Sequence, residues 1–178
     1  PMLGYGDEIG MGDDLSLPGR EAARTPMQWS DAKHGGFSTA DRLYRPVIET
    51  GPFGYRQVNV RAQQRDEDSL LSWIARTLRA RKGCPEISWG DWQVLDGMAP
   101  GVLVMRCDWR GRTLVTVHNF AGERRRLALS VAQAGSPVLE DLLARNDSVA
   151  ADQTHRLELE PYDFRWFRSG PEEQPRRA

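Results

Sequence analysis

The chain has 178 residues, of which 39% are hydrophobic and 28% are charged, and its formal net charge is −1 at pH 7. This composition is typical of a soluble globular protein with one domain or slightly more. A net charge so close to zero provides no electrostatic basis for binding nucleic acid or an anionic membrane, so we expect neither partner. No apolar run approaches the roughly 18 residues that cross a bilayer.

Cysteine and histidine usage argues against a metal or disulfide framework. Cys84 and Cys107 are the two cysteines, and we expect both to be reduced thiols of a cytoplasmic protein. His34 lies beside Gly35-Gly36 without a second ligand at metal-binding spacing, so we interpret it as a loop histidine. The sequence therefore predicts no metal site and no cofactor.

Residues 1–11 are predicted to form a short buried strand that ends in a loop. An apolar start is followed by the acidic Asp7 and Glu8, and then by Gly10. A lone buried strand needs neighbours on both sides, and no second parallel strand follows in the chain. We therefore expect this strand to belong to a larger sheet, and the chain to be a truncated part of a longer protein.

Residues 12–62 are predicted to form a long ordered loop. Glycines and prolines interrupt any periodicity, but aromatic residues throughout the segment argue against disorder. Arg24 offers five fixed donors, and Trp29 and Phe37 offer flat apolar faces, a combination that suits a sugar. The alternative is a structural ion pair between Arg24 and a loop carboxylate, with Trp29 in the core.

The rest of the chain changes from helical to strand periodicity. Residues 66–82 predict a helix that is capped by Asp66 and ended by Gly83 and Pro85. Arg110-Gly111 predicts a tight hairpin between two strands. The predicted strands cover residues 87–95, 102–109, 112–120, 123–131, 138–143, 155–159 and 162–168. Short strands at this spacing indicate an antiparallel sandwich.

Several motifs together resemble glycoside hydrolase family 13, the α-amylase superfamily. Tyr5-Gly6-Asp7-Glu8-Ile9-Gly10-Met11 resembles the end of barrel strand eight, and Arg24-Thr25-Pro26-Met27-Gln28-Trp29 resembles the loop that follows it. Gly35-Gly36-Phe37-Ser38 and residues 55–64 (YRQVNVRAQQ) extend this likeness to the α-glucosidase-like branch. Gly12-Asp13-Asp14-Leu15 and residues 159–167 (LEPYDFRWF) resemble the trehalose synthases of the family.

The resemblance implies a mainly β chain in which a C-terminal antiparallel β-sandwich is preceded by the last β/α unit and long loop of a (β/α)8 barrel. Residues 1–83 would be the end of the catalytic barrel, with its last strand, substrate loop and last helix. Residues 84–168 would be the sandwich. Residues 169–178 are rich in Gly, Pro, Glu and Arg, and we expect a disordered tail there.

The chain is not expected to contain a catalytic residue. Retaining glycosyl transfer needs two carboxylates about 5 Å apart. Asp7 and Glu8 point to opposite faces if they lie on a strand, so they cannot form this pair. The resemblance implies that the nucleophile, the acid and a third acid lie at the ends of barrel strands four, five and seven, which would precede Pro1.

The resemblance gives Arg24 a role in substrate binding. In the α-glucosidase-like branch, the arginine that matches Arg24 holds the terminal glucose at the subsite where the bond is cleaved. The implied function is the C-terminal part of a trehalose synthase-like enzyme that interconverts maltose and trehalose by retaining glucosyl transfer. The implied partners are maltose, trehalose or other α-glucosides, and the remainder of the catalytic barrel.

Two other functions remain open at the level of sequence. One is a hydrolysing α-glucosidase or amylase of the same family. The other is a non-catalytic β-sandwich with a structural or carbohydrate-binding role. Exposure of Trp89, Trp92 and Trp109 on one face would favour sugar binding, whereas burial of all three would favour a structural role. His118 is expected to be a satisfied structural histidine in a strand.

Overall fold

The computed structural model describes residues 2–144 and 146–170. The chain separates into two compact units, Pro1–Leu78 and Arg79–Ala178. The division falls inside helix α2 (Leu70–Lys82), a few residues before the predicted boundary at residues 83 and 84, and the domain assignment stays a prediction. None of the helices in the described residues is long and apolar enough to cross a membrane.

Irregular loop, short helical turns and the first part of α2 make up the described residues of the first unit, and none of these residues forms a strand. These turns are η1 (Asp7–Ile9), η2 (Gly19–Glu21), η3 (Lys33–Gly36) and α1 (Val60–Gln63). The predicted strand at residues 1–11 is therefore wrong. Gly6 and Gly10 adopt positive φ angles of 94° and 69°, which fold the segment into η1. Its backbone groups are bonded locally instead of in a sheet.

The long loop of the first unit is ordered by hydrogen bonds around the fully buried Gln28. Its Nε2 donates to the carbonyls of Phe53 at 3.1 Å and Val58 at 2.6 Å. The backbone carbonyl of Gln28 accepts from Val60 N at 2.9 Å. One residue thus joins segments that lie 25 to 32 positions apart in the sequence, and the predicted ordered loop is confirmed.

Helix α2 is confirmed, but its start differs from the prediction. Asp66 does not cap it; instead, Asp66 accepts from Asp68 N in a turn, at 2.9 Å. Ser69 Oγ accepts from Ser72 N at 3.2 Å and takes the capping role. No residue of α2 is fully buried in this chain, and Leu70 remains 41% exposed. The apolar residues Leu70, Leu71, Ile74 and Leu78 recur at helical spacing and are half-buried or exposed within this chain.

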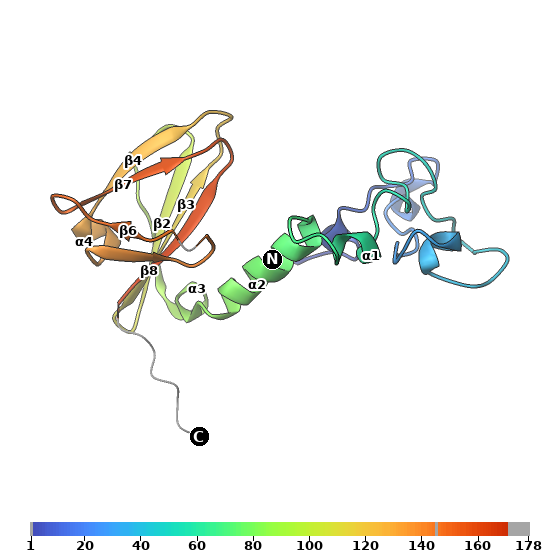
Figure 1. Cartoon of the computed structure of the whole chain (residues 1–178), viewed down its shortest axis with the longest axis horizontal. Helices are drawn as coiled ribbons and strands as arrows, with labels where there is room; N and C mark the ends of the chain where they lie inside the picture. Colours follow the sequence, from blue (N-terminus) through green and yellow to red (C-terminus); the bar gives the residue numbers. More distant parts are fainter. Residues whose placement is uncertain (1, 145, 171–178) are drawn as a thin grey trace, which may run out of the picture. The chain divides into compact units, whose positions relative to one another are not determined.

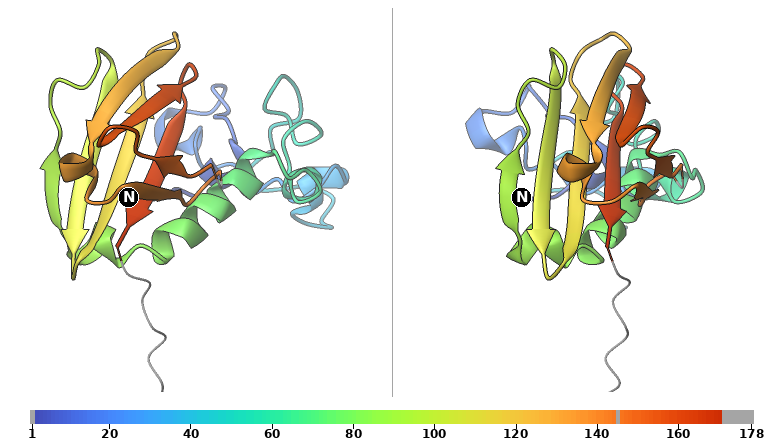
Figure 2. Two further views of the ribbon diagram at one scale, coloured as in Figure 1. Left: turned by 60° about the vertical axis from the view of Figure 1, so that its left-hand side comes forward. Right: turned by 90° about the vertical axis from the view of Figure 1, so that its left-hand side faces the viewer.

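The second unit is an antiparallel β structure in which the end of α2 and the short helix α3 (Pro85–Trp89) precede the strands (Figure 1). A six-stranded sheet has the order β1-β2-β3-β8-β5-β6, and a two-stranded sheet pairs β4 with β7. Figure 2 shows β4 and β7 lying over one face of the larger sheet. The strands are β1 (Asp91–Val94), β2 (Val102–Trp109), β3 (Arg112–Asn119), β4 (Arg125–Ser130), β5 (Val138–Asp141), β6 (Ser148–Val149), β7 (Thr154–Leu159) and β8 (Phe164–Ser169).

The core of this unit lies between its two sheets. Val104, Val115 and Phe167 of the large sheet are at most 2% exposed and belong to the same cluster as Leu129 and Leu159 of the small sheet. Burying side chains of this size contributes about 1.5–3 kcal/mol each. The predicted hairpin is confirmed, because Trp109 pairs with Arg112 across Arg110 and Gly111, both at positive φ.

Three predicted segments of the second unit need correction. Residues 87–89 belong to α3 rather than to a strand, because Pro85 starts this helix and Gly90 ends it. The predicted strand 123–131 stops at Ser130, whose hydroxyl caps the helical turn α4 (Val131–Ala134). Ser169, placed in the predicted tail, ends β8 and is buried. Residues 171–178 lie outside the described part of the chain.

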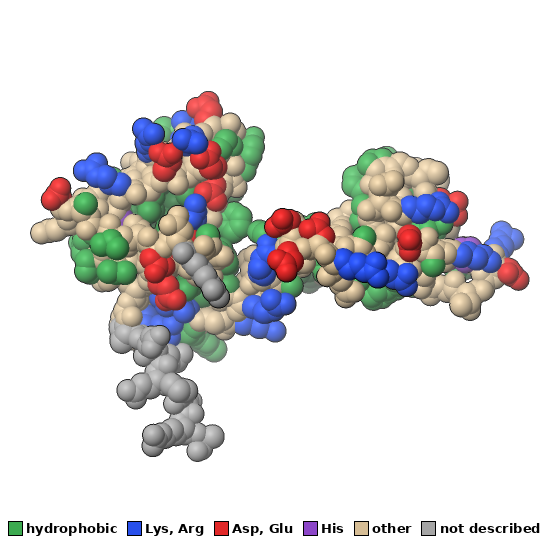
Figure 3. Space-filling model, in the orientation of Figure 1, with side chains coloured by type: hydrophobic (Ala, Val, Ile, Leu, Met, Phe, Trp, Pro, Cys, Tyr) green, Lys and Arg blue, Asp and Glu red, His purple; other side chains and the backbone are tan. Residues whose placement is uncertain are grey.

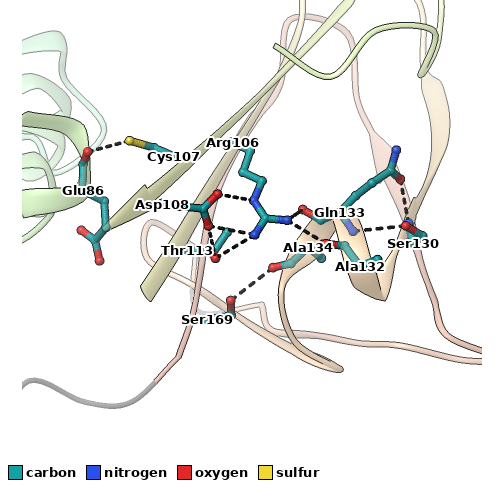
Figure 4. Close-up of polar contacts among 10 residues, drawn as sticks. All are labelled: Glu86, Arg106, Cys107, Asp108, Thr113, Ser130, Ala132, Gln133, Ala134 and Ser169. Atoms are coloured by element: carbon teal, nitrogen blue, oxygen red, sulfur yellow. Dashed lines mark hydrogen bonds and ion pairs between the residues drawn. The ribbon is translucent and has the colours of Figure 1, made fainter. Parts of the chain in front are cut away.

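Polar contacts fasten α4 to the large sheet (Figure 4). Arg106 Nη1 donates to the carbonyls of Ala132 at 2.7 Å and Gln133 at 2.9 Å. The same guanidinium pairs with Asp108, through Nε and Oδ2 at 2.6 Å. Hydrogen bonding from Arg106 lowers the pKa of Asp108, so this carboxylate stays charged well into acid. Arg106 thus satisfies carbonyls at the end of α4.

A buried ion cluster lies on the other face of the large sheet. Glu86 of α3 is fully buried, and its Oε1 lies 3.0 Å from Arg112 Nε and 3.1 Å from Arg168 Nε. These two contacts lack hydrogen-bond geometry, whereas Arg168 Nη2 donates to Glu86 Oε2 at 3.3 Å. Cys107 donates to the carbonyl of Glu86 at 2.6 Å, and burial raises the pKa of this thiol to about 11. The cluster therefore anchors α3 to β2, β3 and β8.

Replacing Glu86 with Ala should destabilise the second unit by about 3–5 kcal/mol, because it removes the buried anion that faces two arginines. Urea denaturation of the purified chain measures this loss. Glu123→Ala is the matched control, since Glu123 pairs with Arg125 while its own side chain remains 75% exposed. A Glu86→Ala variant as stable as the control would contradict the anchoring role.

Candidate functional site

A cleft of about 590 Å³ lies within the first unit and includes Arg24 in its lining. Tyr5, Phe37 and Tyr44 contribute aromatic rings, and these side chains are 59%, 48% and 97% exposed. Asp7 and Arg45 add one acidic and one further basic group. An open cleft with aromatic walls and a few polar groups is typical of a small-molecule site.

Arg24 is positioned at this cleft by the loop that follows η2. Its backbone N–H donates to the carbonyl of Glu21 at 3.0 Å. Its Nη1 lies 3.9 Å from Glu21 Oε1, while 57% of the side chain remains exposed. The sugar-binding and ion-pair interpretations of the sequence are therefore compatible, because the weak pair with Glu21 leaves much of the guanidinium accessible.

The structure brings together some of the other residues that the sequence singled out. Phe37 joins Arg24 in the cleft lining, but Trp29 does not, although its side chain is 50% exposed. Asp14 accepts from Ser16 N at 3.0 Å and serves a turn.

Asp7 and Glu8 bind amides of their own loop. Asp7 Oδ2 accepts from Gly4 N at 2.7 Å, and Glu8 Oε2 accepts from Gly6 N at 2.9 Å. Because both residues lie in η1, the argument that a strand points them to opposite faces does not hold. The two carboxylates instead stabilise the turn by accepting hydrogen bonds from its backbone amides.

Three aromatic or basic residues of the cleft are not expected from the sequence. It places Tyr5 in a predicted strand and marks neither Tyr44 nor Arg45 as a site residue. Tyr5 Oη accepts from Met27 N at 2.5 Å, a contact over 22 positions that no periodicity predicts. Tyr5 opens a motif quoted above, and Arg45 precedes Pro46, which favours an extended backbone there, but neither signal indicates a cleft.

The three tryptophans proposed as a sugar-binding face are neither all exposed nor all buried. Trp89 is 76% exposed and Trp92 is 43% exposed, whereas Trp109 is half-buried. The ring of Trp109 lies under the guanidinium of Arg110, at 4.7 Å. Trp92 Nε1 donates to the carbonyl of Ile87 at 3.3 Å. His118 lies between Phe120 and Phe164, at centroid distances of 6.1 and 6.2 Å, and burial lowers its pKa.

Comparison with known families accounts for most of the chain. Residues 1–90, just over half of the sequence, match the family described as alpha amylase, catalytic domain. The chain belongs to the alpha-amylase family. Residues 111–168 match the sucrose hydrolase-like C-terminal domain, which agrees with the antiparallel sheet of the second unit. The family assignment made from motifs is thereby confirmed.

Individual members of the alpha-amylase family resemble the chain over most of its length. The trehalose synthase/amylase TreS of Mycobacterium tuberculosis is 35% identical over 173 residues, which are 94% of this chain and 29% of that protein. The trehalose-6-phosphate hydrolase of Escherichia coli is 29% identical over 154 residues, 86% of this chain and 26% of that protein. The chain thus spans under a third of the length of these relatives.

A solved structure of the same family shares the fold. A mutant of MutB in complex with glucose is 25% identical to this chain and aligns with a TM-score of 0.63. The alignment covers 86% of this chain and 26% of that one. The match extends across both units and agrees with the succession of loop, helix and antiparallel sheet seen here.

Replacing Gln28 with Ala should loosen the alpha-amylase loop that carries Arg24. The change leaves the partly buried carbonyls of Phe53 and Val58 without their side-chain donor, at a cost of at most about 1–3 kcal/mol each. We expect faster hydrogen exchange at the amides of residues 53–60 and Trp29. Gln57→Ala, at an exposed position in the same loop, is the control. Unchanged exchange in Gln28→Ala would contradict the account of how this loop is ordered.

Proposed function

We propose that the chain supplies the substrate-binding loop and the C-terminal sheet of an enzyme that interconverts maltose and trehalose. In this proposal, Arg24 holds a glucose unit in the cleft of the first unit. The observation that carries the proposal is the accessible guanidinium of Arg24 beside Tyr5, Phe37 and Tyr44. Aromatic faces suit the apolar faces of a sugar ring, and the fixed N–H donors of arginine suit its hydroxyls.

Likeness to trehalose synthases supports the maltose–trehalose assignment. The identity of 35% to the mycobacterial trehalose synthase/amylase extends over 94% of the chain. It includes both the loop around Arg24 and the second unit. Hydrolysis of an α-glucoside is the second candidate, favoured by the likeness to the E. coli trehalose-6-phosphate hydrolase.

The proposed contribution of this chain is binding rather than bond cleavage. Retaining transfer needs a nucleophile and an acid about 5 Å apart. Asp7, the acidic residue in the cleft lining, already accepts a backbone hydrogen bond from Gly4. We therefore assign the two reacting carboxylates to other parts of the whole enzyme, and substrate orientation to Arg24. Fixing the glucose relative to those groups lowers the activation barrier of the transfer, because the entropy of orienting the sugar is lost on binding and not in the reaction step.

Replacing Arg24 with Ala should weaken maltose binding by the purified chain at least tenfold, because a charge-assisted hydrogen bond contributes about 1.5–3 kcal/mol. The affinity is measured by titrating each variant with maltose while the NMR chemical shifts of the cleft amides are recorded. Arg20→Ala is the control, since Arg20 lies in the same loop but outside the cleft lining. Equal affinities for the two variants would contradict the role proposed for Arg24.

A further inference from the structure

We infer that Glu21 is a positioning residue that holds Arg24 and Arg45 together at the cleft. This inference rests on the proposed function, because it assigns a role at the same sugar-binding site. Glu21 does not itself line the cleft, whereas both arginines do. It acts on the sugar through them.

The two carboxylate oxygens of Glu21 face two different guanidinium groups. Oε1 lies 3.9 Å from Arg24 Nη1, and Oε2 makes a close ion pair with Arg45 Nη2. Arg45 also donates through Nη1 to the backbone carbonyl of Arg24 at 3.5 Å. The three residues thus form a closed set of contacts, in which Arg45 contacts both the side chain of Glu21 and the main chain of Arg24.

The set joins two segments that are distant in the sequence. Glu21 ends η2, and Arg45 lies 24 positions later, beside the exposed Tyr44. The guanidinium of Arg45 lies 5.9 Å from the centre of the Tyr44 ring. Arg45 thus lies at the edge of cation–π range of an aromatic residue of the cleft lining.

The exposures of these groups indicate positioning rather than a large contribution to stability. The side chains of Arg24, Glu21 and Arg45 are 57%, 36% and 30% exposed, and ion pairs at such positions contribute little to folding. Without Glu21, two like charges would face each other at the cleft, and both long side chains would become ordered only when sugar binds. That ordering would weaken binding without unfolding the chain.

Substitution of Glu21 in the purified 178-residue chain tests the inference. In Glu21→Gln, the side-chain Nε–H signals of Arg24 and Arg45 should show increased mobility and faster solvent exchange by NMR. Maltose affinity should fall by about two- to tenfold. Glu21→Asp, which keeps the charge, should restore part of both effects. A purely structural role would change backbone stability and would not be rescued in this way.

The matched control is Asp31→Asn, which removes a comparable exposed pair with Arg61 at 3.6 Å outside the cleft. It should change neither arginine signal. Unchanged mobility of Arg24 and Arg45 in Glu21→Gln would overturn the inference, whatever happens to sugar binding. If Glu21→Gln fails to fold, Arg45→Lys replaces it with the Arg24 signal as the readout, because lysine cannot contact Glu21 and the Arg24 carbonyl with one planar group. Unchanged mobility of Arg24 in that variant would overturn the inference.

The sugar titration separates the two proposals. If maltose leaves the Arg24 signal of the unsubstituted chain unchanged, the proposed binding role of Arg24 fails. The mobility measurement then still decides whether Glu21 orders the two arginines. If maltose shifts Arg24 equally in the unsubstituted chain and in Glu21→Gln, with equal affinity, the binding role stands and the positioning role fails.

Discussion

The order of the first unit depends on the buried amide of Gln28. A loop of some fifty residues, rich in glycine and proline, has no sheet ladder to satisfy its backbone groups. Gln28 takes the place of that ladder. Its side-chain amide donates to the carbonyls of Phe53 and Val58, and its backbone carbonyl accepts a hydrogen bond from Val60 N. The arginine four positions earlier and the aromatic residues of the cleft therefore occupy defined places, although they lie on a loop.

The second unit is stabilised in a different way. Its apolar core lies between two sheets, and each face of the large sheet also carries a polar network. Arg106 fastens α4 on one face, and Glu86 fastens α3 on the other. Figure 3 shows acidic and basic side chains interspersed over the part that carries β4 and β7, where Arg124 and Arg126 pair with Glu158. This mixed surface agrees with the near-zero net charge of the chain.

The sequence predicted best the parts of the fold that depend on periodicity. The apolar runs at residues 102–109 and 112–119, separated by Arg110-Gly111, located β2, β3 and their hairpin. β3 is buried on both faces, which explains why this run is apolar at nearly every position. Prediction failed where a local contact decides the structure. Pro85 and Gly90 turn a strand-like run into α3, and Gly6 and Gly10 turn another into η1.

The candidate site was only partly predictable for a different reason, because long-range contacts build it. Arg24 and Phe37 stand out as residue types within a recognisable motif. The other site residues depend on contacts between residues more than twenty positions apart. Tyr5 contacts Met27, and Glu21 contacts Arg45. Spacing along the sequence does not report these contacts, and the three-dimensional arrangement of the loop was needed to find them.

The central claim is that the chain binds an α-glucoside but does not cleave it. Incubation of the purified chain with maltose, with trehalose and glucose both measured, tests this claim most directly. The account predicts that neither product forms. Formation of trehalose or glucose at a rate abolished by replacing a single carboxylate of this chain, such as Asp7→Asn, would contradict it.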